Sequence, residues 1–329
     1  MKAIINQTDN VVSDMLNGFY FEHQHRLTYD QDHQIISEAL KTNQVALISG
    51  GGSGHEPAHF GYVADGMLTT SVSGRLFTPP SVEQILKAIQ MSDVGDGVLL
   101  IVKNFASDVE MFQKAKEQAV TQGHSVETVI VDDDVSIEDQ THYKKRKRGV
   151  AGTIFVYKLL GAYARNGASL DTLKKVGDHI TEQLHTLGVA LSPAHLPVEN
   201  QSTFTLDESE VYYGVGIHGE KGYRKEPFES SEQLAVELIN KLKSIYMWKP
   251  GERFACLING LGSTPLMEQY IFSHDVKRLM EIEGLKIDFF KVGTHMSSYN
   301  MAGISLSLLK LIEADWANYL QEPTNAPNW

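Results

Sequence analysis

Residues 44–57 read QVALISGGGSGHEP, an apolar run that ends in four glycines within five positions. An apolar run that stops at glycines is typical of a buried strand at its carboxyl end. Glycine lets the backbone adopt a positive φ and approach a ligand closely. Pro57 suits the first turn of a helix, so the stretch predicts a strand, a glycine-rich connection and a helix that begins near His55. Open α/β sheets bind ligands at this end of their strands.

Two phosphate-binding loops are excluded by the residues of this stretch. A Walker A loop needs Gly-Lys five places after its first glycine, and from Gly50 or Gly51 those places hold His-Glu and Glu-Pro. A dinucleotide fingerprint that starts at Gly52 would need a third glycine where Pro57 stands. Two interpretations stay open, a turn that binds a hydroxyl or small anion beside His55, and a tight turn whose histidine bonds only locally.

The composition narrows the class of protein. The chain has 329 residues, with 29 Lys and Arg against 41 Asp and Glu, so its formal net charge is −12. Such a chain is poorly suited to binding DNA or an anionic membrane through its overall field. Cys256 is the single cysteine, which excludes an internal disulfide framework. We expect a cytoplasmic protein, because the first residues lack a signal-peptide core and no apolar run has membrane-spanning length.

Short apolar runs alternate with helical patterns, which predicts an α/β fold. Ser81 and Gln84 have the spacing of a helix capping box. A polar, proline-containing segment at 189–210 places the domain boundary, giving domains 1–188 and 189–329. The predicted strands are 44–49, 67–73, 97–102, 126–131, 211–219, 253–260, 286–292 and 303–311, and the predicted helices are 81–89, 108–123, 149–167, 169–188, 230–246 and 264–282.

Two further clusters carry polar side chains at the ends of predicted strands. VKNFASD (102–108) contains Lys103 and ends in Asp108, which either shares a ligand-binding edge with His55 or simply caps the next helix. GVGIHGE (214–220) places His218 between glycines, where a histidine is accessible. His55, Asp108 and His218 could supply a nucleophile and an acid–base pair, although an isolated histidine is more often structural.

The basic run at 144–148 follows an acidic segment, so we interpret it as a solvated loop with local charge pairing. A contact site for an acidic partner is the alternative. The sequence shows no spacing of histidines, carboxylates or cysteines typical of a metal site, and we expect no metal and no cofactor.

The ordered motifs resemble the dihydroxyacetone-binding (DhaK) family over nearly the whole chain. The resemblance implies two DhaK-like α/β domains, each a mixed sheet flanked by helices, and a homodimer. The motifs are SGGGSGHEPAHFGYV (49–63), LLIVKNF (99–105), VIVDDD (129–134), RGVAGTIFVYKLLGA (148–162), GASL (167–170), YGVGIHGE (213–220), NGLGSTPLMEQ (259–269) and NMAGISLSLLKL (300–311).

The resemblance also implies roles for individual residues. The histidine at the position of His218 attacks the ketone carbon of dihydroxyacetone and forms a covalent hemiaminal. In kinase members, the residues matching Asp108 and His55 act as acid and base toward the terminal hydroxyl. The resemblance assigns the binding of the ligand's hydroxyls and the remaining ligand contacts to Gly52, Ser53, Gly54, His55, Lys103 and Asp108. Kinase members of this size carry no nucleotide site, and an ADP-binding helical subunit, recharged by a phosphotransferase-system protein, supplies the phosphoryl group.

The family includes DhaQ-like paralogues that bind the same ligand but act as coactivators of a TetR-type transcription factor. The ligand residues do not separate the two roles. Phe105 and Ser107 depart from the Lys-Asn-Tyr-x-Gly-Asp of kinase members, and Pro79 replaces a hydroxyl-bearing residue. Arg75 and the pair at 294–295 also depart from the usual pattern. The departures favour a ligand sensor over the DhaK subunit of a phosphotransferase-dependent kinase, and the end of the chain at residue 329 leaves no room for an appended helical domain.

Overall fold

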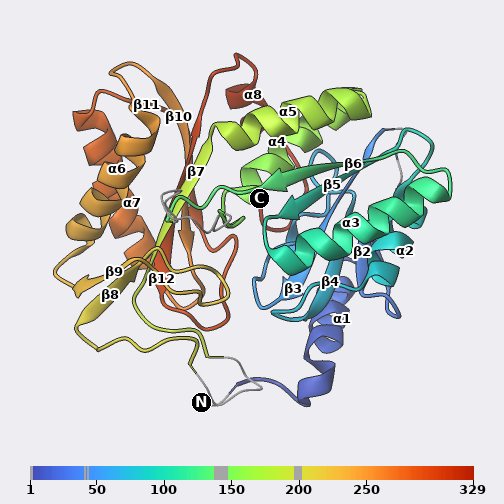
Figure 1. The fold of residues 1–329 in the computed structure, drawn as a ribbon, viewed down its shortest axis with the longest axis horizontal. Coiled ribbons are helices and arrows are strands. Elements are labelled where there is room, and N and C mark those ends of the chain that lie inside the picture. The colour runs from blue at the N-terminus through green and yellow to red at the C-terminus, as the bar shows by residue number, and fades with distance from the viewer. Residues whose placement is uncertain (1–2, 41, 43, 137–146, 196–201) are drawn as a thin grey trace. The chain divides into compact units, whose positions relative to one another are not determined.

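The computed structural model describes residues 3–40, 42, 44–136, 147–195 and 202–329 (Figure 1). The chain divides into two compact units, each built around one six-stranded sheet. The first unit comprises Met1–Val131, Val156–His179 and Glu322–Trp329, and the second comprises Asp132–Phe155 and Ile180–Gln321. Within the described ranges, every helix is too short or too polar to cross a bilayer.

The sheet of the first unit has the strand order β1-β2-β4-β3-β5-β6. β3 pairs in parallel with β4 and β5, and β5 in parallel with β6, whereas β2 pairs antiparallel with β1 and β4. The parallel strands are buried along most of their length, as the continuous apolar runs predict. The strands are β1 (Leu27–Asp30), β2 (Ile35–Glu38), β3 (Ala46–Ser53), β4 (Thr70–Leu76), β5 (Val98–Lys103) and β6 (Val126–Val131).

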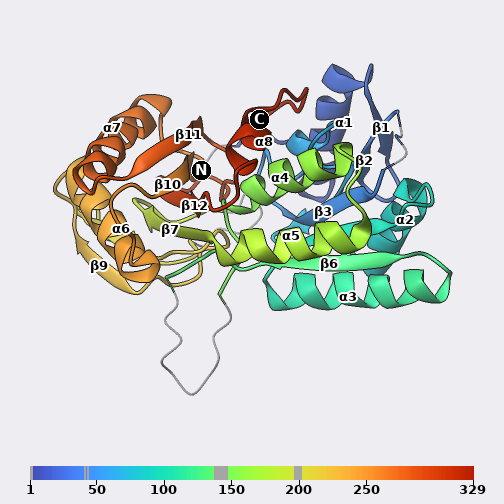
Figure 2. The same cartoon turned by 90° about the horizontal axis from the view of Figure 1, so that it is seen from above.

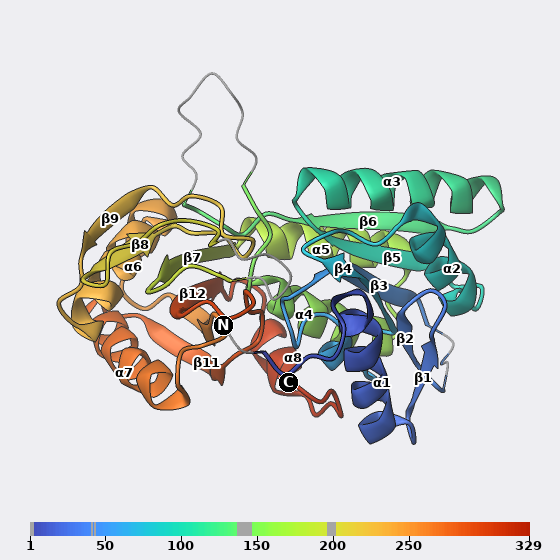
Figure 3. The same cartoon turned by 90° about the horizontal axis from the view of Figure 1, so that it is seen from below.

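Helices cover both faces of this sheet. α2 and α3 share one apolar cluster with β3, β4 and β5, and Figure 2 shows α3 and α5 on opposite sides of β6. Figure 3 shows α1 beside β1, against which it packs. The predicted capping box forms at the start of α2, where Ser81 and Gln84 bond reciprocally. The helices are α1 (Val11–His23), α2 (Val82–Ser92), α3 (Ala106–Thr121), α4 (Thr153–Arg165) and α5 (Leu170–Glu182), with short 3-10 helices at Thr8–Asn10 and Phe60–Tyr62.

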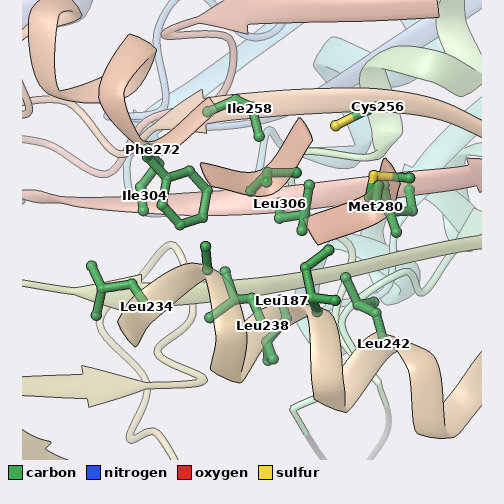
Figure 4. Close-up of a cluster of buried hydrophobic side chains, with 14 of the residues drawn as sticks. Leu187, Leu234, Leu238, Leu242, Cys256, Ile258, Phe272, Met280, Ile304 and Leu306 are labelled. Carbon is green, nitrogen blue, oxygen red and sulfur yellow. The ribbon is translucent and has the colours of Figure 1, made fainter. Parts of the chain in front are cut away.

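The sheet of the second unit has the strand order β11-β10-β12-β7-β8-β9, with β10 and β11 parallel and the other pairs antiparallel. Figure 4 shows Leu234, Leu238 and Leu242 of α6 facing β7 and β12 in its core. The elements are β7 (Leu184–Ala190), β8 (Glu210–Tyr213), β9 (Arg224–Pro227), α6 (Ser231–Tyr246), β10 (Arg253–Gly260), α7 (Leu266–Ile282), β11 (Lys286–Gly293), β12 (Gly303–Lys310) and α8 (Trp316–Gln321).

The predicted class, two mixed α/β sheets flanked by helices, is confirmed. Several local predictions are wrong. The helix expected over 169–188 ends at Glu182, because the following residues pair with β12 as β7. The strand expected over 211–219 ends at Tyr213. The two compact units alternate along the chain, because Asp132–Phe155 belongs to the second unit and Val156–His179 to the first, and the division into domains 1–188 and 189–329 stays a prediction.

Candidate functional site

The glycines after the first predicted strand lie inside that strand. β3 continues through residues 50–52, all buried. A Cβ atom on Gly50 would lie 2.3 Å from the carbonyl oxygen of Val72 in β4, so glycine is needed there for the close approach of two strands. Of the glycines in this stretch, only Gly54 has a positive φ, at 106°. The predicted left-handed conformation is therefore confined to one residue.

The helix predicted to begin at Pro57 is absent from this described segment. Residues 56–59 form a turn, and a single 3-10 turn, Phe60–Tyr62, follows. The carbonyl of His55 accepts from the N–H of Ala58, which closes the chain back on itself. The turn brings His59 to β5, where its ring hydrogen-bonds to Lys103. This contact between distant residues forms where the sequence predicted the start of a helix.

A compact group of polar atoms faces Gly51. A Cβ atom there would lie 2.6 Å from Nζ of Lys103, 3.2 Å from Nε2 of His59 and 3.3 Å from Oδ1 of Asp108. Lys103 ends β5 and Asp108 lies in the first turn of α3, and both side chains are almost fully buried. Because Gly51 has no side chain, an ammonium, an imidazole and a carboxylate converge at this end of the sheet.

Asp108 does not cap its helix, which was the alternative role considered for it. Phe105 stands at the cap position and its side chain makes no capping hydrogen bond, while Asp108 is the third helical residue. A carboxylate in the first turn still interacts favourably with the positive end of the helix dipole. Ser107 is exposed and helical, a conformation open to any L-residue, so the serine does not distort the backbone beside Asp108.

The loop after β3 is held against the segment that follows β4. The ring of His55 is fully buried and stacks on Phe77, with centroids 5.0 Å apart and an interplanar angle of 6°. A Cβ atom on Gly52 or Gly54 would lie 2.5 Å from that segment, so both positions need glycine. The hydroxyl of Ser53 donates to a backbone carbonyl of β4 at 2.8 Å. The loop is therefore a packed structure that presents polar groups from fixed positions.

His59 belongs to this cluster, although no local pattern in the sequence indicates it. Its Nε2 lies 3.1 Å from Nζ of Lys103 and its Nδ1 lies 2.6 Å from the hydroxyl of Tyr157. Burial, followed by the charge of Lys103, holds the pKa of His59 well below its ordinary value, so the imidazole is neutral. His59 follows His55 by four residues in the same loop, but the sequence does not indicate which histidine turns toward Lys103.

His218 lies in the loop after β8 in the second unit. The loop turns at Gly214 and Gly219, with φ of 77° and 79°. The side chain of His218 is 21% exposed. Its Nδ1 lies 3.2 Å from Oε1 of Glu220, and its backbone N–H donates to Oε2 of the same carboxylate at 3.1 Å. The two contacts with Glu220 orient the imidazole.

Glu220 is ionised in spite of its surroundings. Burial opposes ionisation, but the hydrogen bond and charge of His218, with the charge of Arg148, lower the pKa of Glu220 to about 2. A carboxylate accepts hydrogen bonds, so in the neutral imidazole the proton resides on Nδ1 and Nε2 carries the lone pair. This arrangement leaves Nε2 able to act as a nucleophile toward an electrophilic carbon.

Arg148 explains part of the basic run. Its Nε bonds to Oδ2 of Asp134 at 2.6 Å, and one terminal nitrogen donates to the hydroxyl of Ser136 and to the carbonyl of Gly214. The guanidinium is buried and braces the start of the His218 loop. Residues 144–146 lie outside the described residues, so the solvated-loop interpretation of the run stays a prediction there. Within the described ranges, no group of three histidine, cysteine or acidic residues could hold a metal ion.

Comparison with known proteins agrees with these motifs. A family model of the Dak1 domain matches residues 17–328. The chain belongs to the Dak1 family. The Dak1 domain therefore spans both units, and Lys103, Asp108 and His218 all lie within it.

Two curated relatives from Lactococcus lactis match this Dak1 chain almost end to end. A PTS-dependent dihydroxyacetone kinase, dihydroxyacetone-binding subunit DhaK, is 45% identical over 329 residues, covering 100% of this chain and 99% of its own. The DhaKLM operon coactivator DhaQ is 46% identical over 327 residues, covering 98% and 99%. Their names describe different roles, so overall identity does not separate a kinase subunit from a coactivator.

Solved structures of two related proteins have the same fold as this Dak1 chain. The dihydroxyacetone kinase operon coactivator DhaQ superposes with a TM-score of 0.92 at 46% identity, covering 96% of this chain and 98% of its own. The dihydroxyacetone kinase of C. freundii also superposes with a TM-score of 0.92, at 34% identity, covering all of this chain and 60% of its own. The fold is shared by a coactivator and by a dihydroxyacetone kinase.

Proposed function

We propose that this protein captures dihydroxyacetone as a covalent hemiaminal on His218 and serves as a ligand-sensing coactivator of a TetR-type regulator of dihydroxyacetone metabolism. The observation that carries the proposal is the orientation of His218, whose Nδ1 faces Glu220. Two relatives that match nearly the whole chain support the ligand class, because one is named as a dihydroxyacetone-binding subunit and the other as the coactivator of a related operon.

The covalent step balances with the groups present. The Nε2 lone pair of His218 forms a bond to the ketone carbon, and the π pair of the carbonyl moves to its oxygen, which takes a proton from water. The water becomes hydroxide, and the ring carries a positive charge that the carboxylate of Glu220 stabilises. The proton on Nδ1 then passes to that hydroxide, which re-forms water and leaves the neutral hemiaminal. Glycerol has similar hydroxyls but no carbonyl, so this step excludes it by chemistry rather than by size.

The first unit supplies the groups proposed to bind the hydroxyls of the ligand. Backbone and side-chain groups of residues 52–55 form one part of this set. Lys103 and Asp108, which converge beside Gly51, form the other part, as a donor and an acceptor. In a kinase member the equivalents of Asp108 and His55 would also move the proton of the attacking hydroxyl, a role that would be vestigial in a sensor.

The choice of a sensor over a kinase subunit depends on Phe105, Ser107 and Pro79. These residues differ from the usual kinase pattern while the ligand residues are kept. Ser107 is exposed beside the buried Asp108, so this departure changes the surface next to the carboxylate and leaves the carboxylate itself in place. The alternative function is the dihydroxyacetone-binding subunit of a phosphotransferase-dependent kinase, with an ADP-binding helical subunit as its partner. A homodimer is proposed in either case.

Covalent capture is tested with dihydroxyacetone labelled with carbon-13 at its carbonyl carbon. Binding should move that carbon signal from the ketone range to the range of a tetrahedral carbon, and His218→Ala should abolish the new signal. His274→Ala, which removes an exposed histidine of α7, is the matched control and should leave it intact. Loss of the signal in both variants, or in neither, would contradict the role of His218.

The two candidate roles are separated by a turnover assay. The purified protein is supplied with dihydroxyacetone, the ADP-loaded helical subunit and a recharging system. We expect no dihydroxyacetone phosphate, and ligand-dependent co-purification with the TetR-type regulator. Steady turnover would overturn the sensor proposal in favour of the kinase subunit. Light scattering of the same preparation tests the homodimer.

A further inference from the structure

A continuous chain of buried hydrogen bonds runs behind Lys103. Nζ of Lys103 lies 3.1 Å from Nε2 of His59, and Nδ1 of His59 lies 2.6 Å from the hydroxyl of Tyr157. That hydroxyl lies 2.7 Å from Oγ of Ser49, which in turn lies 2.7 Å from the carbonyl oxygen of Ile101. The chain links β3, β5 and α4 with the turn after β3, all within the first unit.

The last bond of the chain determines the direction of all the others. A carbonyl oxygen has no proton, so Ser49 must donate to Ile101, and its single hydroxyl proton is then used. Tyr157 must therefore donate to Ser49, and Tyr157 in turn accepts from Nδ1–H of His59. A neutral imidazole with a proton on Nδ1 presents a lone pair at Nε2, and that lone pair accepts from the ammonium of Lys103.

We propose that Ser49 and Tyr157 are positioning residues that hold His59 in its Nδ1–H tautomer, and that His59 thereby fixes the direction of the ammonium of Lys103 beside Gly51. In the other neutral tautomer, Nε2 would point a proton at the ammonium, and two donors would face each other. The inference rests on the proposed ligand role of Lys103. It adds Ser49 and Tyr157 as residues that act on ligand binding through His59, by orienting the ammonium of Lys103.

The geometry around Gly51 indicates what this aiming achieves. The atoms that a Cβ at Gly51 would meet are Nζ of Lys103, Nε2 of His59 and Oδ1 of Asp108. A lysine side chain has several rotatable bonds and a strongly hydrated head, so burial alone does not give its ammonium a direction. Donation of one N–H to His59 therefore gives the ammonium a set direction, and in this proposal the ligand meets the ammonium in that direction.

The tautomer of His59 is measured first in the ligand-free protein. Long-range nitrogen–proton correlation spectra of protein labelled with nitrogen-15 histidine distinguish Nδ1–H from Nε2–H rings, and the signal lost in His59→Gln assigns the residue. We expect the Nδ1–H form. In Tyr157→Phe, His59 loses its acceptor, and we expect a mixture of tautomers or the Nε2–H form. An Nε2–H ring in the unaltered protein would overturn the proposal.

Affinity for dihydroxyacetone is the second readout. Tyr157→Phe should weaken binding roughly tenfold, the effect of losing about one hydrogen bond. His59→Gln, whose amide oxygen can still accept from Lys103, should retain more affinity than His59→Leu. Tyr29→Phe is the matched control, because Tyr29 belongs to the same unit and its hydroxyl has no hydrogen-bond partner among the described residues.

The outcomes separate this proposal from the proposed function. If the unaltered protein binds dihydroxyacetone but Tyr157→Phe changes neither the tautomer nor the affinity, the chain of bonds does not position Lys103 and the proposal is wrong. If the unaltered protein fails to bind dihydroxyacetone, the proposed function is wrong, and the tautomer spectra still decide whether the hydrogen-bond chain has the inferred direction. Equal losses of affinity in Tyr157→Phe and Tyr29→Phe would reduce the effect to general destabilisation and overturn the positioning role.

Discussion

His218 and Glu220 form a closed unit two residues apart in the chain. Glu220 accepts from the backbone N–H of His218 through one oxygen and faces Nδ1 of the same residue through the other, at 3.1 Å and 3.2 Å. Gly216 makes room for this arrangement, because a Cβ atom there would lie 2.1 Å from Oε2 of Glu220. The local sequence Gly-x-His-Gly-Glu therefore holds an imidazole with its Nε2 away from the carboxylate.

Glu220→Ala should weaken or slow covalent capture of dihydroxyacetone by about 10- to 100-fold, since a hydrogen bond to a charged group contributes about 1.5–3 kcal/mol. Glu220→Gln, which keeps an acceptor for Nδ1–H but loses the charge, should fall between the parent and the alanine variant. The carbon-13 signal of the bound ketone carbon measures both. Full capture by Glu220→Ala would show that the carboxylate does not orient or activate His218.

Gly51→Ala should separate ligand binding from folding. The added Cβ would meet the flexible end of Lys103 at 2.6 Å, so the lysine can move aside and the protein should fold. Its ammonium would then leave the direction set by His59, and affinity for dihydroxyacetone should fall at least tenfold. Calorimetric titration measures the affinity, and thermal unfolding reports the stability.

Gly50→Ala, one residue earlier in β3, should lower stability, in contrast to Gly51→Ala. Its Cβ would meet the backbone carbonyl of Val72 at 2.3 Å, which cannot move without separating β3 from β4. We expect a loss of about 1–3 kcal/mol in the free energy of unfolding, the usual cost of overpacking. If Gly51→Ala lowers the free energy of unfolding as much as Gly50→Ala does, the side chain of Lys103 cannot move aside as we infer.

Glu38, at the end of β2, should make the first unit less stable as pH rises. Burial, and next the charge of Asp65, raise the pKa of Glu38 to about 7. A carboxyl with a raised folded-state pKa contributes stability that is complete below its ordinary pKa, near 4.5, and is lost as pH rises through about 7. Glu38→Gln should therefore match the parent protein in urea unfolding at pH 4.5 and exceed it at pH 8, by up to about 3 kcal/mol.

The exposed Glu117 of α3 supplies the control for this experiment. Glu117→Gln removes an exposed carboxylate from the same unit and is measured beside Glu38→Gln at both pH values. A Glu38→Gln variant that is no more stable than the parent protein at pH 8 would contradict the raised pKa of Glu38.

Ser107→Gly should lower stability without restoring phosphoryl transfer. Ser107 occupies the first turn of α3 in an ordinary helical conformation, and glycine in a helix costs roughly 0.5 kcal/mol relative to serine. Urea unfolding measures this loss, and the turnover assay with the helical subunit measures dihydroxyacetone phosphate. Turnover gained by Ser107→Gly alone would show that this position by itself blocks the kinase reaction.

Local signals in the sequence predicted the elements that depend on neighbouring residues. The capping box at Ser81 and Gln84 forms as expected. The strands that follow continuous apolar runs are also present, because such runs are buried on both faces of a parallel sheet. β7 was missed because its residues continue the polar and apolar spacing of α5, and only pairing with β12 makes them a strand.

The sequence by itself determined the α/β class, the family, and the position of Lys103, Asp108 and His218 at or just after the ends of apolar segments. The tertiary structure decided that three glycines of GGGSG belong to a strand. It also decided that a turn containing His59 stands where an α-helix was predicted. The physical reason is distance along the chain. The contacts that decide these features join Gly50 to Val72 and His59 to Lys103 and Tyr157, pairs that no local pattern of residues can reveal.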